Sequence, residues 1–285
     1  MFRRLVPFIL AMALIMVIFT GCGERSMTED EQDDIVEVDE LQDGKYLVKI
    51  PVSEQGNYPM AHMEVDNGEI VSFKYSEILA DSGEEKSEDN YEYQDGLDVI
   101  ADLNEQFNQK KTLAEVDFDA VSGATSTKEE FKNAVNQLLL MASNGEVYEP
   151  RYIDGEYRAQ AEEPNNDWLA EVLIVIREGQ IVGIDYSEIA VKDRTSSKVV
   201  FDNDNRAVIG ADDKPKTEPV EVKEGDKKSI ENYAHLDAFD VMKGVQRLVI
   251  DNNGVDDLNL DAITGATGTR ETMLELIEKA LEGAV

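Results

Sequence analysis

One nine-residue pattern occurs twice in this chain. Residues 119–127 read DAVSGATST and residues 261–269 read DAITGATGT, and each copy leads directly into apolar residues at helical spacing. The copies share the aspartate, the Gly-Ala-Thr tripeptide and the final threonine. A chain that carries such a pattern twice must fold it in two equivalent places, so we expect these positions to share a chemical role.

The two motifs belong to a longer duplication. An offset of 111 residues aligns Tyr-Ser-Glu-Ile at 75–78 with the same tetrapeptide at 186–189, and an offset of 142 aligns the motifs. The second copy has therefore gained 31 residues (142 minus 111). We place this insertion near 192–228 and expect a surface loop or flap, since exposed insertions cost little free energy.

Each copy begins with signals for a small antiparallel sheet. Alternating residues and tight turns predict strands at 46–50, 61–65, 70–75, 172–176 and 181–186. Helical segments follow in both copies. We therefore predict an α+β fold with two tandem repeats of a small antiparallel sheet packed with helices, the first domain at 43–145 and the second at 150–285.

Apolar spacing predicts which helix faces are buried. After the motifs, the predicted buried residues are Phe131, Ala134, Val135, Leu138, Leu139 and Ala142, matched 142 residues later by Met273, Leu276, Ile277, Ala280, Leu281 and Ala284. In the helix before each motif, they are Leu97, Ile100, Ala101 and Phe107, with Phe239, Met242 and Val249 in the second copy. Equivalent helices are thus expected to bury equivalent faces.

The amino end has the composition of an export signal. Two arginines precede an apolar run that ends in Phe-Thr-Gly-Cys at 19–22. It resembles a bacterial lipoprotein signal peptide, which implies that residues 1–21 are removed and Cys22 is lipidated, although Phe19 replaces the more usual leucine of that cleavage box. An uncleaved membrane anchor is the alternative. Both place the body at the cell membrane, facing outside the cytoplasm, with 22–42 as an acidic tether.

Composition excludes several classes of function. The net charge of −34 makes nucleic acid an implausible partner, because phosphate binding needs clustered lysine and arginine. Cys22 is the only cysteine, so no disulfide and no cysteine-based metal site can form within the chain. The acidic run at 202–206 does not complete a calcium loop, because Ala207 stands where glycine is required. We predict no metal site.

The motif has two interpretations. A hydroxyl before a helix can cap free backbone N–H groups, and Ser126 with Glu129, or Thr127 with Glu130, fits a capping box. Capping leaves Gly-Ala and the first threonine unexplained. Glycine permits a sharp turn and the close approach of a ligand, while a helix start offers N–H donors to an anion. The motif is therefore predicted to seat a phosphate.

Several repeated side chains near the motif remain open. Lys128 and its equivalent Arg270 either screen a phosphate or face solvent. Tyr75 and Tyr186 either stack on a bound ring or pack in the core, and Glu77 and Glu188 either hydrogen-bond a ligand or face solvent. Trp168 has no counterpart in the first copy and is expected to pack beside the sheet, and neither His62 nor His235 is shared by the two copies.

The pattern Asp-x-x-(Ser/Thr)-Gly-Ala-Thr, followed by x-Thr and an amphipathic helix, resembles the FMN-binding domain of sodium-translocating NADH:quinone reductases and Rnf-type electron-transport complexes. In that family a magnesium-dependent FAD:protein FMN transferase attaches FMN to the threonine of Gly-Ala-Thr through a phosphoester bond. The resemblance implies covalent FMN on Thr125 and Thr267. The other cofactor-binding positions that it implies are Asp119, Ser122, Gly123, Ala124 and Thr127, and in the second copy Asp261, Thr264, Gly265, Ala266 and Thr269.

A lipid-anchored tandem of this kind also resembles the flavin lipoproteins of extracellular electron transfer in Gram-positive bacteria. The resemblance implies an exported electron carrier with two FMN groups, passing electrons from a membrane quinol or NADH-dehydrogenase-type donor to extracellular acceptors. Neither motif has a histidine or lysine base before its threonine, so we expect the chain to be a substrate of the transferase. The alternatives are a solute- or cation-binding lipoprotein without flavin and an FMN-dependent extracellular reductase, which a lid over the second flavin would favour.

Overall fold

The computed structural model describes residues 35, 36, 38, 40–120 and 123–285, and Ile35–Val285 form one compact unit. The expected signal peptide at 1–21, Cys22 and most of the expected tether at 22–42 lie outside the described residues. Within the described part of the chain, no helix is both long and apolar enough to cross a bilayer.

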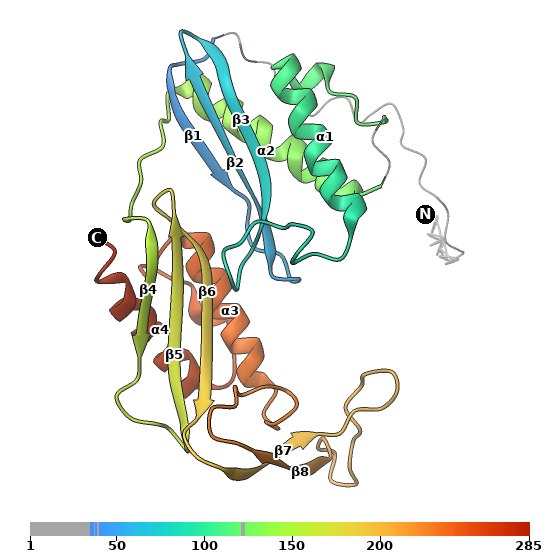
Figure 1. The fold of residues 1–285 in the computed structure, drawn as a ribbon, viewed down its shortest axis with the longest axis vertical. Coiled ribbons are helices and arrows are strands. Elements are labelled where there is room, and N and C mark those ends of the chain that lie inside the picture. Colours follow the sequence, from blue (N-terminus) through green and yellow to red (C-terminus); the bar gives the residue numbers. More distant parts are fainter. Residues whose placement is uncertain (1–34, 37, 39, 121–122) are drawn as a thin grey trace, which may run out of the picture. The chain divides into compact units, whose positions relative to one another are not determined.

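Two three-stranded antiparallel sheets follow one another along the described chain (Figure 1). The first contains β1 (Gly44–Lys49), β2 (Asn57–Asp66) and β3 (Glu69–Leu79), and the second contains β4 (Gly155–Gln160), β5 (Trp168–Arg177) and β6 (Gln180–Ala190). In each sheet the strands pair in sequence order. Both sheets are therefore simple meanders. The sequence predicted every strand of the two sheets except β4.

Helices cover one face of each sheet (Figure 1). They are α1 (Gln94–Lys110), η2 (Leu113–Glu115) and α2 (Thr125–Asn144), then α3 (Asp237–Asn252), η3 (Leu260–Ala262) and α4 (Thr267–Leu281). The α1 helix contacts β3 and α2 contacts β1 and β2, while α3 contacts β6 and α4 contacts β4 and β5. The predicted α+β class, with small antiparallel sheets packed with helices, is confirmed.

The hairpin turns follow from local sequence. Asn67 and Gly68 have φ of 54° and 76°, and Glu178 and Gly179 have φ of 51° and 69°. Positive φ at both central residues defines the turn whose twist matches that of two antiparallel strands. The strand register also shifts at Glu64/Val65 and at Val175/Ile176, two positions that correspond at an offset of 111.

The predicted buried faces of α2 and α4 are confirmed, because all twelve residues named for these segments are buried. The predicted face of α1 is wrong apart from Phe107. The helix buries Val99, Leu103 and Phe107, whereas Leu97 and Ile100 are only partly covered. In α3 the same shift occurs, with Val241, Val245 and Val249 buried and Phe239 and Met242 half-buried. Both helices carry two overlapping apolar stripes. Packing of α1 on β3 and of α3 on β6 determines which stripe is buried.

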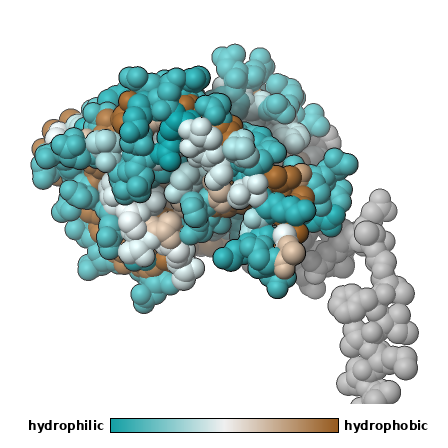
Figure 2. All heavy atoms as spheres, turned by 90° about the horizontal axis from the view of Figure 1, so that it is seen from below, coloured by the Kyte–Doolittle hydropathy of each residue, from teal (hydrophilic) through white to brown (hydrophobic). Residues whose placement is uncertain are grey.

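The inserted segment contains a ribbon of two strands, which sequence patterning did not predict. Strand β7 (Arg194–Val199) pairs antiparallel with β8 (Thr217–Val222). Val222 packs with Trp168 and Ala190 in a small buried cluster at the end of the second sheet. The insertion is thus attached where β5 begins and β6 ends. Figure 2 shows a largely hydrophilic face of the molecule, with apolar residues in small separate groups.

The far side of the first sheet packs against the second repeat. Tyr58 is fully buried, and its hydroxyl donates a 2.8 Å hydrogen bond to the carbonyl of Val182. The Lys49 ammonium donates to the main-chain carbonyls of Ile181 and Ile250. Burial lowers the pKa of the Lys49 amine to about 8, although the nearby Asp251 opposes this shift.

Replacing Phe131 with alanine should lower the free energy of unfolding by about 3–5 kcal/mol, because a large ring is removed from a closed core. Phe131 is fully buried and contacts the rings of Phe73, Tyr75 and Phe107. Urea unfolding measures the change. Leu140→Ala on the same helix is the control: its side chain is 44% exposed, so the loss should be much smaller. Equal losses would contradict the assigned face.

Lys49 should make stability depend on pH. Its pKa in the folded chain, about 8, lies below the ordinary value of 10.5, so the unfolded chain binds more protons between these two pH values. The free energy of unfolding therefore gains a contribution that rises with pH across this window. Unfolding of wild type and of Lys49→Met, compared at several pH values from 7 to 10, should show a difference that grows in favour of wild type. A constant difference would show that Lys49 does not titrate in this way.

Candidate functional site

Both motifs fold into the same strained turn. Gly123 and Gly265 have φ of 85° and 90°, and the alanines that follow them, Ala124 and Ala266, have φ of 43° and 29°. Positive φ is costly for any residue with a Cβ atom, and it persists only where the surroundings enforce it. The same cost at two equivalent alanines shows that the fold imposes this turn in both repeats.

The turn delivers a threonine to the first position of each helix. Thr125 begins α2 and Thr267 begins α4, and both side chains are exposed. The N-cap residue before each threonine is the alanine with positive φ. Neither N-cap makes a side-chain capping hydrogen bond. The capping interpretation is therefore wrong. The first N–H groups of a helix have no partner within it, so these two starts keep donors and positive potential for an anion.

The second threonine of the first motif serves a different purpose. Thr127 is buried, and its hydroxyl donates a 2.9 Å hydrogen bond to Oε1 of Glu77 near the end of β3. Glu77 also accepts from the Lys86 ammonium at 2.5 Å. The side chains of Lys86 and Glu77 are 5% and 6% exposed, so water is excluded from this ion pair. Strand end, loop and helix start are thereby joined beside Thr125.

The second repeat contains the same buried pair. Lys228 bonds Glu188, and these side chains are 7% and 10% exposed. Each lysine also lies over an aromatic ring, with Lys86 Nζ 4.2 Å from the centre of Tyr91 and Lys228 Nζ 4.2 Å from that of Tyr233. The solvent-facing alternative for both glutamates is wrong. Sequence reasoning missed the lysines, although Lys-Ser-x-x-Asn-Tyr recurs at 86–91 and 228–233 with the motif's own offset of 142.

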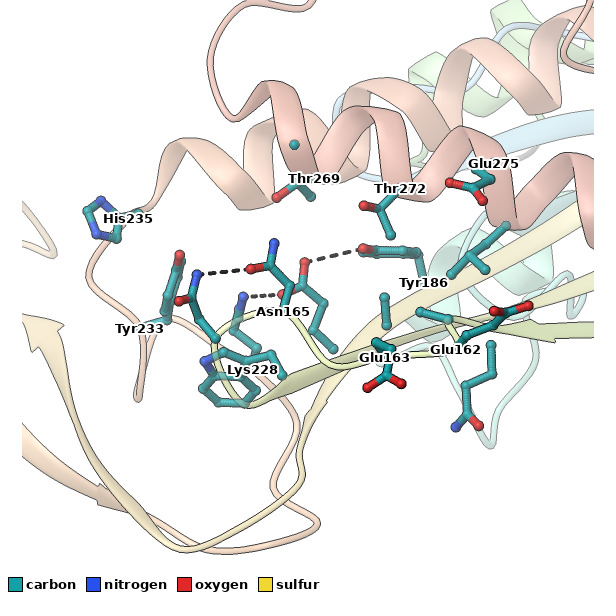
Figure 3. A pocket seen from close by; sticks show the side chains of 18 of the residues that line it. Glu162, Glu163, Asn165, Tyr186, Lys228, Tyr233, His235, Thr269, Thr272 and Glu275 are labelled. Atoms are coloured by element: carbon teal, nitrogen blue, oxygen red, sulfur yellow. Dashed lines mark hydrogen bonds and ion pairs between the residues drawn. The ribbon is translucent and has the colours of Figure 1, made fainter.

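A cavity of about 560 Å³ adjoins the second motif (Figure 3). Thr269, Thr272 and Glu275 of α4 form one side of it, and Tyr186, Lys228 and Tyr233 lie across from them. The Tyr186 hydroxyl donates to Glu188 at 3.2 Å, so the tyrosine and the buried ion pair form one network in the wall. Volumes of this order suit a small ligand held by a few placed polar groups.

Two buried polar atoms near these sites have no hydrogen-bond partner among the described residues. They are Nε of Arg194, which lines the cavity, and the hydroxyl of Tyr75. Burial and the nearby Glu77 and Glu130 carboxylates raise the pKa of the Tyr75 hydroxyl, which therefore stays protonated. Buried donors are normally satisfied, and an orphan is a reason to expect an additional group nearby.

The remaining predicted residues divide between surface, cavity and core. Asp119, Asp261, Thr264, Gly265 and Gly123 are exposed, Thr269 is half-buried in the cavity wall, and Ser122 lies outside the described residues. Tyr75 is a core residue that packs on Phe131, whereas Tyr186 lines the cavity. Trp168 is buried, but it is the first residue of β5 and so belongs to the sheet; it also borders the cavity, as does His235. His62 pairs with Glu178 at 2.7 Å.

Arg270, the basic residue after the second motif, is held locally. Arg270 donates a 3.0 Å hydrogen bond to the carbonyl of Ile263, which precedes the turn, and Lys128 is half-buried. Arg270 therefore ties the motif to its own helix and does not simply face solvent. Across the described part of the chain, no cluster of three or more histidine, cysteine, aspartate or glutamate side chains is placed to hold a metal ion.

One part of the chain, most of the first repeat, resembles a known family. Residues 60–140 match the family model of the FMN-binding domain. No curated protein matches the chain. Among solved structures, the CPE2226 protein of Clostridium perfringens is 25% identical, with a TM-score of 0.33, over 38% of this chain and 93% of that one. The family match supports an FMN-binding domain and a flavin-associated role.

Removing one partner of the buried pair should destabilise the protein. Lys86→Met leaves Glu77 buried without a cation, so the free energy of unfolding should fall by about 3–5 kcal/mol. Removing both charges with Lys86→Met and Glu77→Gln should recover most of this loss, because no uncompensated charge then remains. Urea unfolding of the wild type and both variants measures the difference. Equal losses in both variants would show that the pair acts through packing alone.

Proposed function

We propose that this chain is an exported, membrane-anchored electron carrier that holds FMN covalently on Thr125 and Thr267. One observation carries the proposal: in both repeats a strained Gly-Ala turn places an exposed threonine hydroxyl on the first residue of an uncapped helix. A phosphate esterified to this hydroxyl would lie where helix N–H groups and positive potential are available. The match of residues 60–140 to the FMN-binding domain supports flavin as the group that carries this phosphate.

The residues near the second motif fit FMN. Tyr186 and Tyr233 are partly exposed and offer aromatic surface to a planar ring, with the buried Trp168 behind them in the same wall. The buried Nε–H of Arg194, in this wall, has no partner among the described residues. Thr269 and Gly268 line the same cavity, so a group attached at Thr267 has a short path into it. Near the first motif, the buried hydroxyl of Tyr75 likewise has no hydrogen-bond partner among the described residues. When bound, FMN supplies reversible electron transfer, and the chain supplies position and electrostatics.

Attachment requires a second protein. A threonine hydroxyl is a weak nucleophile unless a base or metal activates it. Among the described residues, the Glu77 carboxylate already accepts from Thr127, and Lys86 is held in an ion pair with the same carboxylate. An FAD:protein FMN transferase would provide the activation. The carrier would take electrons from a membrane quinol or NADH-dehydrogenase-type donor and pass them to extracellular acceptors, held at the membrane through lipid on Cys22.

A stand-alone FMN reductase is a second candidate, because Arg194 at the start of the inserted ribbon lines the cavity beside α4. The insertion therefore borders the second site. Turnover of a small electron acceptor by purified, flavin-loaded protein, lost on removal of the ribbon while the flavin is retained, would favour this candidate over a carrier.

Coexpression with an FAD:protein FMN transferase, followed by intact-mass measurement, tests the proposal. Wild type should carry two FMN adducts, Thr125→Val and Thr267→Val one each, and the double variant none, because each substitution removes one acceptor oxygen. Ser126→Ala is the matched control, since Ser126 is an exposed hydroxyl one residue from Thr125. It should keep both adducts. A wild-type protein without flavin in the presence of active transferase would overturn the proposal and favour a binding lipoprotein.

A further inference from the structure

We propose that the two repeats are electrostatically unequal and that the Thr267 site gives its flavin the higher reduction potential. The inequality comes from Glu130, which is present only beside the first site, and from Arg194, which is present only beside the second. This inference rests on the proposed function, because it concerns flavin held at both threonines.

Glu130 and Thr272 occupy equivalent positions at the offset of 142. Thr272 lines the cavity of the second repeat, about one turn along α4 from Thr269. Glu130 is half-buried at the same place on α2. Burial and the nearby Glu77 raise the pKa of the Glu130 carboxyl, so this position already resists added negative charge. The first site therefore carries an acid where the second has a neutral hydroxyl.

Arg194 has no equivalent in the first repeat, since it begins the inserted ribbon. Its guanidinium lies 5.7 Å from the ring of Trp168, and its side chain is 27% exposed. Asp167 is 3.7 Å away, but this carboxylate also pairs with Lys192 at 2.9 Å. Because Asp167 is shared between two cations, it neutralises Arg194 only in part. The insertion thus adds positive charge to the cavity.

The charged groups that differ between the two sites are therefore of opposite sign. Both sites share the buried lysine–glutamate pair, Lys86 with Glu77 and Lys228 with Glu188. Beyond this pair, the first site adds the half-buried carboxylate of Glu130, and the second adds Arg194, which Asp167 neutralises in part. Other charged residues border the cavity, namely Glu162, Glu163, Glu275 and Lys279, and all four are exposed. Solvent and salt screen exposed charges more than partly buried ones, so Glu130 and Arg194 should act more strongly on a bound flavin than these four residues.

Reduction adds negative charge to the flavin ring. A nearby cation stabilises that charge and a nearby carboxylate opposes it, so charge beside the ring shifts the reduction potential. Both differences between the sites act in the same direction. At equilibrium, electrons shared between the two flavins should therefore reside mainly on the flavin attached to Thr267.

The single-acceptor variants make the two potentials separately measurable. Thr267→Val retains only the first flavin and Thr125→Val only the second, and intact mass verifies the loading of each. In redox titrations followed by flavin absorbance, the Thr267 site should have the higher potential. We expect at least a tenfold difference in the two-electron equilibrium constant, which corresponds to about 30 mV.

Charge removal then assigns the difference to its source. Glu130→Gln should raise the potential of the first site and leave the second unchanged, while Arg194→Gln should lower that of the second and leave the first unchanged. Glu129→Gln and Glu271→Gln are matched controls, since these glutamates are equivalent in the two repeats and both are exposed. Neither control should move either potential.

Several results would overturn the inference, and they differ in what they say about the proposed function. Equal potentials, the reverse order, or shifts in the controls as large as in Glu130→Gln would overturn it while leaving the carrier proposal intact. Loading of only one threonine would also overturn it. Absence of any adduct on the wild type would overturn the proposed function and this inference together, and intact mass shows this before any titration begins.

Discussion

The first candidate site depends on a buried lysine–glutamate pair that joins a strand end, the loop after it and the start of a helix. Glu77 lies near the end of β3, Lys86 lies in the loop that follows, and Thr127 brings in the first turn of α2. A buried ion pair contributes little net stability, because desolvation of two charges offsets their attraction. Its strict geometry instead makes alternative placements of the helix start costly. We infer that the pair fixes the place of the acceptor threonine.

The strained alanines are consistent with this arrangement. Left-handed backbone at Ala124 and Ala266 costs free energy that glycine would avoid, and buried packing of the helix that follows must hold each turn in place. In α4 the residues that provide this packing are Met273, Leu276 and Ile277, all buried against the second sheet. The apolar core therefore stabilises the polar turn indirectly: packing fixes the position of the helix, and the helix restrains the backbone of the turn that precedes it.

Sequence patterning predicted what depends on local periodicity. The apolar positions of α2 and α4 form one clear stripe, and the hairpin turns carry their own signals, so both were found. In α1, apolar residues at 97, 99, 100, 101, 103 and 107 form overlapping stripes, and only contact with β3 selects Val99, Leu103 and Phe107. Lys86 and Lys228 were missed because a lysine in a highly acidic chain is typical of a solvated surface. Their burial depends on pairing with Glu77 and Glu188, which lie on strands that precede them, β3 and β6.

Duplication explains the shared chemistry, whereas divergence explains the different surroundings. The turn, the helix start and the ion pair recur in both repeats, so any phosphate seat should be equivalent in the two. What lies beyond the seat is not equivalent: Trp168 stands where the first repeat has Asn57, and Thr272 where it has Glu130. Two identical sites would only double the capacity of a carrier. Because the turn and the helix start are retained while the charge beside them changes, the structure favours two sites with distinct roles.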